Sequence, residues 1–146
     1  MTRQELQELW RASWDGEGWI ATWKGAVADL TAAQAAWKPA SGRHSIWQNV
    51  NHVIFWRGFT TCIAQGRTKP TQEQTEQMNF SEPAQATDPA WRQALADLEK
   101  SHREIEAIIA DPAKSIDRVK HHLSHDAYHL GQIMLLRALQ GLQPLV

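Results

Sequence analysis

The chain has a single cysteine, Cys62, among its 146 residues, so an intrachain disulfide is excluded. Because disulfides persist mainly in oxidising compartments, we expect a reducing, cytoplasmic location. The first residues lack the basic segment and following apolar segment of a signal peptide. No apolar run approaches the roughly 18 residues that span a bilayer, so we expect no membrane partner.

An excess of charge of one sign is also missing. The 15 Lys and Arg residues nearly balance the 16 Asp and Glu residues, which gives a formal net charge of -1 with neutral histidines. No run of basic residues concentrates positive charge in the way that binding to phosphates requires. We therefore expect no nucleic-acid partner.

Strand patterns are scarce, because no convincing alternation of β-branched residues occurs, and helical periodicity covers most of the chain. We expect four long helices, over residues 3–29, 45–65, 88–110 and 115–140. The first should bend near Gly16 and Gly18, a short helical turn should follow Thr31, and a long connection covers residues 67–87. The predicted fold is all-α: one domain over 1–146, a four-helix bundle with a long crossover between the second and third helices.

Tryptophan is frequent, at 8 residues. Four tryptophans in the first predicted helix have the spacing of residues that face a core: Trp10, Trp14, Trp19 and Trp23. We therefore expect these four side chains to pack inside the bundle rather than to bind a substrate.

Histidines are concentrated in the last predicted helix, where His122, His125 and His129 follow one another by three and four residues. His125 and His129 lie one helical turn apart on one face, a spacing at which two imidazoles can hold one metal ion. A third ligand should come from another helix, and both His52 and His102 lie on suitable seams. Spacing does not choose between them, although a hydrogen-bonded core position or a rim position is the favoured interpretation for His102.

Two stretches, SIWQNVNHVIFW (Ser45–Trp56) and LSHDAYHLGQIMLLRALQG (Leu123–Gly141), resemble the signature segments of the DinB/YfiT-like superfamily, also called the damage-inducible DinB superfamily. LTAAQAAWKP (Leu30–Pro39) is similar to the segment that these proteins place between their first two helices. The resemblance implies a four-helix bundle with a metal ion held by His52, His125 and His129, which decides against His102 as a ligand. The sequence departs from many members at Leu130, where they carry Arg.

Three imidazoles leave at least one coordination position of a metal ion open. The ion could be zinc, nickel, iron or manganese, since histidine nitrogen does not distinguish them. The resemblance implies a metal-dependent thiol S-transferase, which joins a small-molecule thiol such as bacillithiol or mycothiol to an electrophile, and a possible homodimer. The alternatives are a hydrolase that activates water at the metal, or a non-enzymatic bundle, stabilised by its metal, that binds a small ligand or a protein partner.

Four further side chains are candidates for the surroundings of the site. Asp126 neighbours His125 but points about 100° away from it around the helix, so we expect it to face solvent at least as readily as it supports a ligand. Gln132 lies on the ligand seam and could bond a ligand or cap the pocket. His122 could be an extra ligand or a proton shuttle, with a rim position favoured, and Trp56 could line the pocket beside His52.

Overall fold

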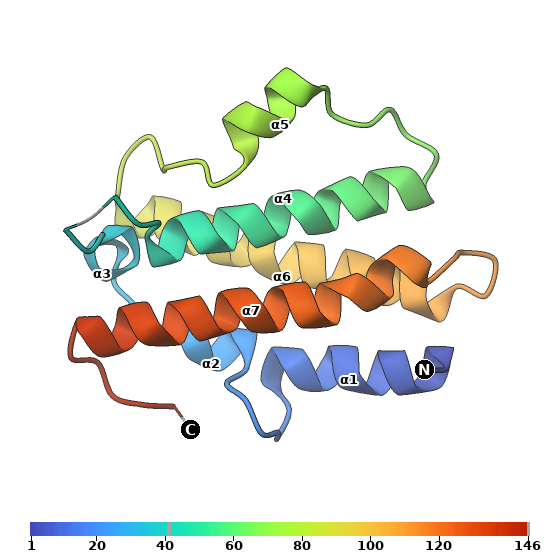
Figure 1. The fold of residues 1–146 in the computed structure, drawn as a ribbon, viewed down its shortest axis with the longest axis horizontal. Coiled ribbons are helices and arrows are strands. Elements are labelled where there is room, and N and C mark those ends of the chain that lie inside the picture. The colour runs from blue at the N-terminus through green and yellow to red at the C-terminus, as the bar shows by residue number, and fades with distance from the viewer. Residues whose placement is uncertain (41, 146) are drawn as a thin grey trace.

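The computed structural model describes residues 1–40 and 42–145 (Figure 1). Within those ranges the chain forms helices and no strands, which confirms the predicted all-α class. The helices in chain order are α1 (Arg3–Asp15), α2 (Trp23–Val27), α3 (Ala32–Ala36), α4 (Ile46–Ala64), α5 (Gln72–Met78), α6 (Asp88–Ala110) and α7 (Asp117–Leu139).

Side-chain caps define where most of these helices begin. The Ser45 hydroxyl accepts a hydrogen bond from the Gln48 backbone N–H, and the Gln48 side chain accepts one from the Ser45 N–H, which is a capping box at the start of α4. Thr31 caps the short α3 in the same way, as the sequence predicts. Gly66 follows α4 with a φ of +66°, a conformation that glycine adopts without strain. The predicted bounds of this helix are therefore confirmed to within a residue or two.

The prediction of one helix over residues 3–29 is wrong. Helix α1 ends at Asp15, where Gly16 adopts an extended conformation, and the chain becomes helical again only at Trp23. Trp19 consequently lies in the connection and is fully exposed, whereas Trp10 and Trp23 are completely buried. A five-residue step that contains two glycines thus breaks the helix instead of bending it, because glycine gains the most backbone freedom outside a helix.

Two other boundaries differ from expectation. The connection over residues 67–87 contains α5, which Thr71 caps with its own capping box. Helix α7 begins at Asp117 rather than at Ser115, although the Ser115 hydroxyl still accepts a hydrogen bond from the Asp117 backbone N–H.

The four longest helices pack against one another. Helix α4 contacts α6 and α7, and α1 contacts both α6 and α7. In Figure 1, α4 and α7 lie side by side toward the viewer, α6 runs behind them, and α5 stands off the outer side of α4. The larger buried cluster joins residues of α2, α3, α4, α6 and α7, and a second cluster joins α1, α6 and the start of α7.

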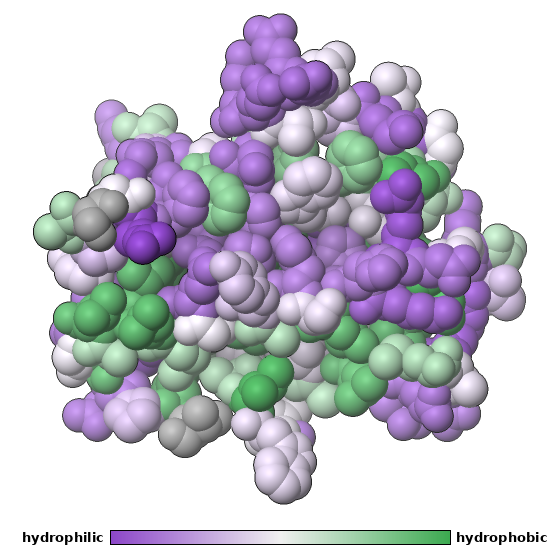
Figure 2. All heavy atoms as spheres, viewed as in Figure 1, coloured by the Kyte–Doolittle hydropathy of each residue, from purple (hydrophilic) through white to green (hydrophobic). Residues whose placement is uncertain are grey.

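The surface is mostly polar in the view of Figure 2, where hydrophilic residues cover the region over α4 and α5. Apolar residues gather toward the C-terminal part of α7, from which Leu135 and Leu139 are exposed. None of the helices in the described ranges is long and apolar enough to cross a membrane.

Candidate metal centre

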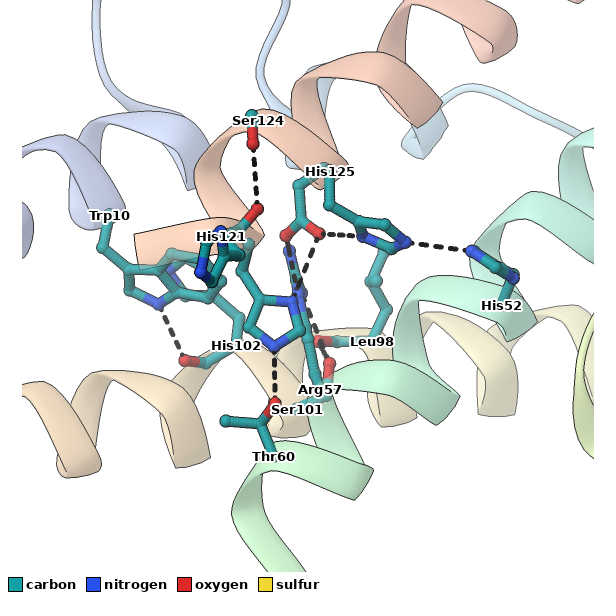
Figure 3. A network of polar contacts seen from close by, with 12 residues as sticks. Trp10, His52, Arg57, Thr60, Leu98, Ser101, His102, His121, Ser124 and His125 are labelled. Atoms are coloured by element: carbon teal, nitrogen blue, oxygen red, sulfur yellow. Dashed lines mark hydrogen bonds and ion pairs between the residues drawn. The ribbon is translucent and has the colours of Figure 1, made fainter. Parts of the chain in front are cut away.

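Three histidine side chains meet between α4 and α7. His52 comes from α4, and His125 and His129 come from successive turns of α7; one ring nitrogen of each lies within 4.8 Å of the others. The Nε2 atoms of His52 and His125 are 3.0 Å apart, a contact that Figure 3 marks with a dashed line. His52 and His129 are buried, whereas the side chain of His125 is 30% exposed and keeps the group open to one side.

Each of these imidazoles has an oxygen partner at its other nitrogen. His52 Nδ1 lies 2.5 Å from Asn79 Oδ1, and His129 Nδ1 lies 2.9 Å from Asn49 Oδ1. His125 Nδ1 lies 3.1 Å from Asp126 Oδ1. Amide and carboxylate oxygens only accept hydrogen bonds, so each Nδ1 must carry the proton and donate it. Each neutral ring then has an unprotonated Nε2 atom.

The meeting of these Nε2 atoms is the feature that fits a metal ion. Two nitrogen lone pairs that face each other at 3.0 Å, as in His52 and His125, repel unless a proton or another cation lies between them. Metal-bound histidines usually donate their second N–H to a carboxylate or carbonyl oxygen. The donor set and its hydrogen-bond partners therefore have the chemistry of a metal centre.

The pKa values of two of these histidines favour the neutral rings that bind metals. Burial lowers the pKa of His52 to about 4, although its hydrogen bond to Asn79 opposes the shift. Burial also lowers the pKa of His129 to about 4, with a further contribution from the nearby His52 and His125 rings. Both rings are therefore neutral at pH 7, as coordination requires.

Asp126 is 3% exposed and contacts His125 Nδ1, so of the two alternatives for this residue the solvent-facing one is wrong. Its Oδ2 atom accepts hydrogen bonds from Arg57 Nε at 2.9 Å and from Arg57 Nη2 at 2.6 Å. Burial alone would raise the pKa of the Asp126 carboxyl, but the positive charge of Arg57 and the contacts of His122 and His125 hold this pKa below its usual value. The side of α7 that carries Asp126 is buried because α4, with Arg57, packs against it.

A second set of possible ligands, His122, His125 and Asp126, also lies close together. A cation bound there would sit beside the guanidinium of Arg57, which already contacts the Asp126 carboxylate. Repulsion between like charges in a buried place makes this set a poor metal site.

His122 and His102 are both buried, but neither joins the three-histidine group. His122 Nε2 lies 2.8 Å from Thr60 Oγ1, so this residue is a buried part of the pocket wall rather than an exposed rim residue. His102 stacks on Trp10 with ring centroids 4.7 Å apart, as Figure 3 shows from one side. Its Nδ1 atom has no hydrogen-bond partner among the described residues, and burial lowers its pKa to about 3.

The three histidines line a hollow of about 550 Å³, which we call the aromatic hollow. Its walls are Trp56, Phe59, Phe80 and Tyr128, so Trp56 lies where the sequence suggests. Gln132 lies elsewhere, beside a separate hollow lined by Pro39 and His44.

Sequence reasoning named Asp126 as a candidate support of His125 but missed the other residues around the histidines. Asn49 and Arg57 lie on the same predicted helix as His52, and an arginine that is buried in a helical bundle demands a carboxylate partner, which is the signal that could have predicted a buried Asp126. Asn79 and Phe80 come from the connection after α5, where no periodicity marks them. Phe80 adopts a φ of +53°, which is rare for a residue other than glycine, and its ring stacks on His52 with centroids 3.9 Å apart.

The fold and this site define an all-helical protein with a buried three-histidine group that fits a metal ion. The family model of the DinB superfamily matches residues 19–133, which include all three histidines. The chain therefore belongs to the DinB superfamily. A search of the curated proteins and a search of the solved structures found no match.

Proposed function

We propose that the Nε2 atoms of His52, His125 and His129 hold a divalent metal ion, and that the protein uses this ion to transfer a low-molecular-weight thiol to an electrophile. The observation that carries the proposal is the convergence of three nitrogen lone pairs beside a hollow. When bound, the ion would supply a positive charge that lowers the pKa of a thiol and makes it a nucleophile. We also infer that α1, α4, α6 and α7 form a four-helix bundle around this site.

The protein residues have separate tasks in this proposal. The side-chain oxygens of Asn79, Asp126 and Asn49 accept hydrogen bonds from the Nδ1–H groups and so fix the orientation of the three rings. Phe80 and Trp56 lie against His52 and keep water away from one side of the site. The partly exposed side of His125 leaves room for the reacting groups.

An enzyme fits this arrangement better than a metal-stabilised structural protein. A structural site would be closed by a fourth side chain, for which the sequence offers His122 and His102. His122 is instead bonded to Thr60, and His102 is stacked on Trp10. Within the described ranges the group thus consists of three histidines and an adjoining hollow, which supports an open coordination position.

The first test is the metal content of untagged protein, measured by elemental mass spectrometry. We expect about one metal ion per chain in the wild type, little in His52→Ala and His129→Ala, and an unchanged content in the control His102→Phe. Circular dichroism checks that each variant is folded. Folded wild-type protein that takes up no zinc, nickel or manganese would refute the metal site.

The second test addresses thiol transfer. Metal-loaded protein is incubated with a panel of low-molecular-weight thiols and a chromogenic electrophile, and the rate is compared with that of His52→Ala. We expect at least one thiol whose transfer depends on the three histidines. A metal-loaded protein that hydrolyses an ester but transfers no thiol would favour the hydrolase alternative.

A further inference from the structure

The aromatic hollow contains one side chain with a fixed charge, and that charge is positive. Arg118, in the first turn of α7, lines the hollow, whereas no carboxylate of the described residues does so. Arg118 is exposed, and its acidic neighbour Asp117 forms its ion pair with Lys120 instead. The guanidinium is therefore free of an ion pair within the described part of the chain and available to a ligand.

The walls of the hollow indicate the remainder of that ligand. Trp56, Phe59, Phe80 and Tyr128 present apolar ring surfaces, on which an apolar or aromatic group packs well. The other lining residues are Thr60, Arg118 and five histidines. A ligand that is charged along its whole length would find few partners here.

The positions of Arg118 and His125 set a distance along α7. They are seven residues apart, which corresponds to two helical turns and about 10 Å. An anion bound at Arg118 is therefore separated from the histidine end of the hollow by about two helical turns along α7. The charged group of the ligand is therefore separate from its reacting end.

We propose that the aromatic hollow binds a ligand with an apolar or aromatic body and a single carboxylate, and that Arg118 holds this carboxylate at the mouth. The assignment of the opposite end as the reacting end rests on the proposed function. A guanidinium binds a carboxylate through two parallel hydrogen bonds. One guanidinium balances one negative charge, which favours a carboxylate over a doubly charged phosphate. Either the thiol or the electrophile of the proposed reaction carries this carboxylate.

The test compares two probes of equal shape, 4-phenylbutanoate and 4-phenylbutanamide, by isothermal titration calorimetry on zinc-loaded protein of measured zinc content. We expect the acid to bind about tenfold more tightly than the amide, as a hydrogen bond to a charged group allows. Arg118→Gln should remove this difference and leave the affinity for the amide unchanged. Arg92→Gln is the matched control, because Arg92 is also an exposed arginine but lies on α6 outside the aromatic hollow.

Two results would overturn the inference. Equal affinity of the wild type for the acid and the amide would show that the hollow has no carboxylate site. A preference for the acid that survives in Arg118→Gln would show that the carboxylate binds elsewhere, for example to the zinc ion.

A second pair of probes separates this inference from the proposed function. An arylalkyl thiol with a terminal carboxylate is compared with its S-methyl thioether, and the corresponding amides are measured in parallel. If thiols outbind thioethers but acids and amides bind alike, Arg118 is no carboxylate site and thiol binding stands. If the preference for acids depends on Arg118 but thiols and thioethers bind alike, the carboxylate site stands and thiol binding fails. Steady-state KM values for carboxylated thiols and carboxylated electrophiles then identify which reactant occupies the site.

Discussion

Replacing Asp126 with asparagine should strongly destabilise the folded protein, because Arg57 would lose its counter-charge inside the core. The side chains of Arg57 and Asp126 are 0% and 5% exposed, and Nη2 and Oδ2 are 2.6 Å apart. Arg57 also lies over the rings of Trp10 and Trp23, where water cannot reach the guanidinium. Breaking a buried ion pair by removing one partner typically costs about 3 to 5 kcal/mol.

That loss is large compared with the usual free energy of unfolding of a protein, about 5 to 15 kcal/mol. In a chain of this length it corresponds to a fall in Tm on the order of 10 °C. Arg57→Met should cost a similar amount, since the Asp126 carboxylate would then stay buried without its main partner. The double variant Arg57→Met/Asp126→Asn should lose about 2 kcal/mol less than the sum of the two single losses, because neither charge remains.

Urea unfolding of metal-free protein, followed by tryptophan fluorescence and circular dichroism, measures these losses. Asp15→Asn provides the control, because Asp15 pairs with Lys24 at 3.5 Å and both side chains are exposed, by 55% and 63%. Solvent screening should limit the cost of Asp15→Asn to about 1 kcal/mol or less. Equal small losses for Asp126→Asn and Asp15→Asn would refute the argument that burial makes the Arg57–Asp126 pair costly to break.

Two further predictions concern Asn49 and His102. Asn49→Ala should weaken zinc binding about tenfold or more, because the Nδ1–H group of His129 loses its acceptor. The control Asn51→Ala should leave zinc binding unchanged, since the Asn51 side chain bonds the backbone of Ser81. Competition with a zinc chelator measures both affinities, and equal zinc affinities of the two variants would contradict the prediction. His102→Phe should reduce the loss of stability between pH 7 and pH 5 by about 2 kcal/mol. The pKa of His102 is about 3 in the folded state, below the ordinary 6.5, so as the pH falls the unfolded state takes up a proton first and the free energy of unfolding decreases. Urea unfolding at both pH values measures this decrease, and an equal decrease in the wild type and in His102→Phe would contradict the prediction.

The helices that carry the site were predictable because their signals are local. Ser45 caps α4, Gly66 follows its end, and a spacing of four residues places His125 and His129 on one face. The surroundings of the site depend on which neighbour covers which side of α7, and local spacing does not contain that information. Asp126 illustrates the limit: its angle around α7 suggests a side chain that points away from His125, yet the packing of α4 buries it and its Oδ1 atom still lies 3.1 Å from His125 Nδ1.

Asp126 connects the buried ion pair to the three-histidine group. Its Oδ2 atom accepts a hydrogen bond from Arg57, and its Oδ1 atom accepts one from the Nδ1–H group of His125. A buried ion pair is seldom more stabilising than well-packed apolar residues of the same volume. An apolar pair at these positions would, however, leave His125 Nδ1 without an acceptor and its ring free to change tautomer. Stability alone therefore does not explain the pair. Its structural consequence is to hold a charged acceptor against His125, which is the most exposed member of the three-histidine group.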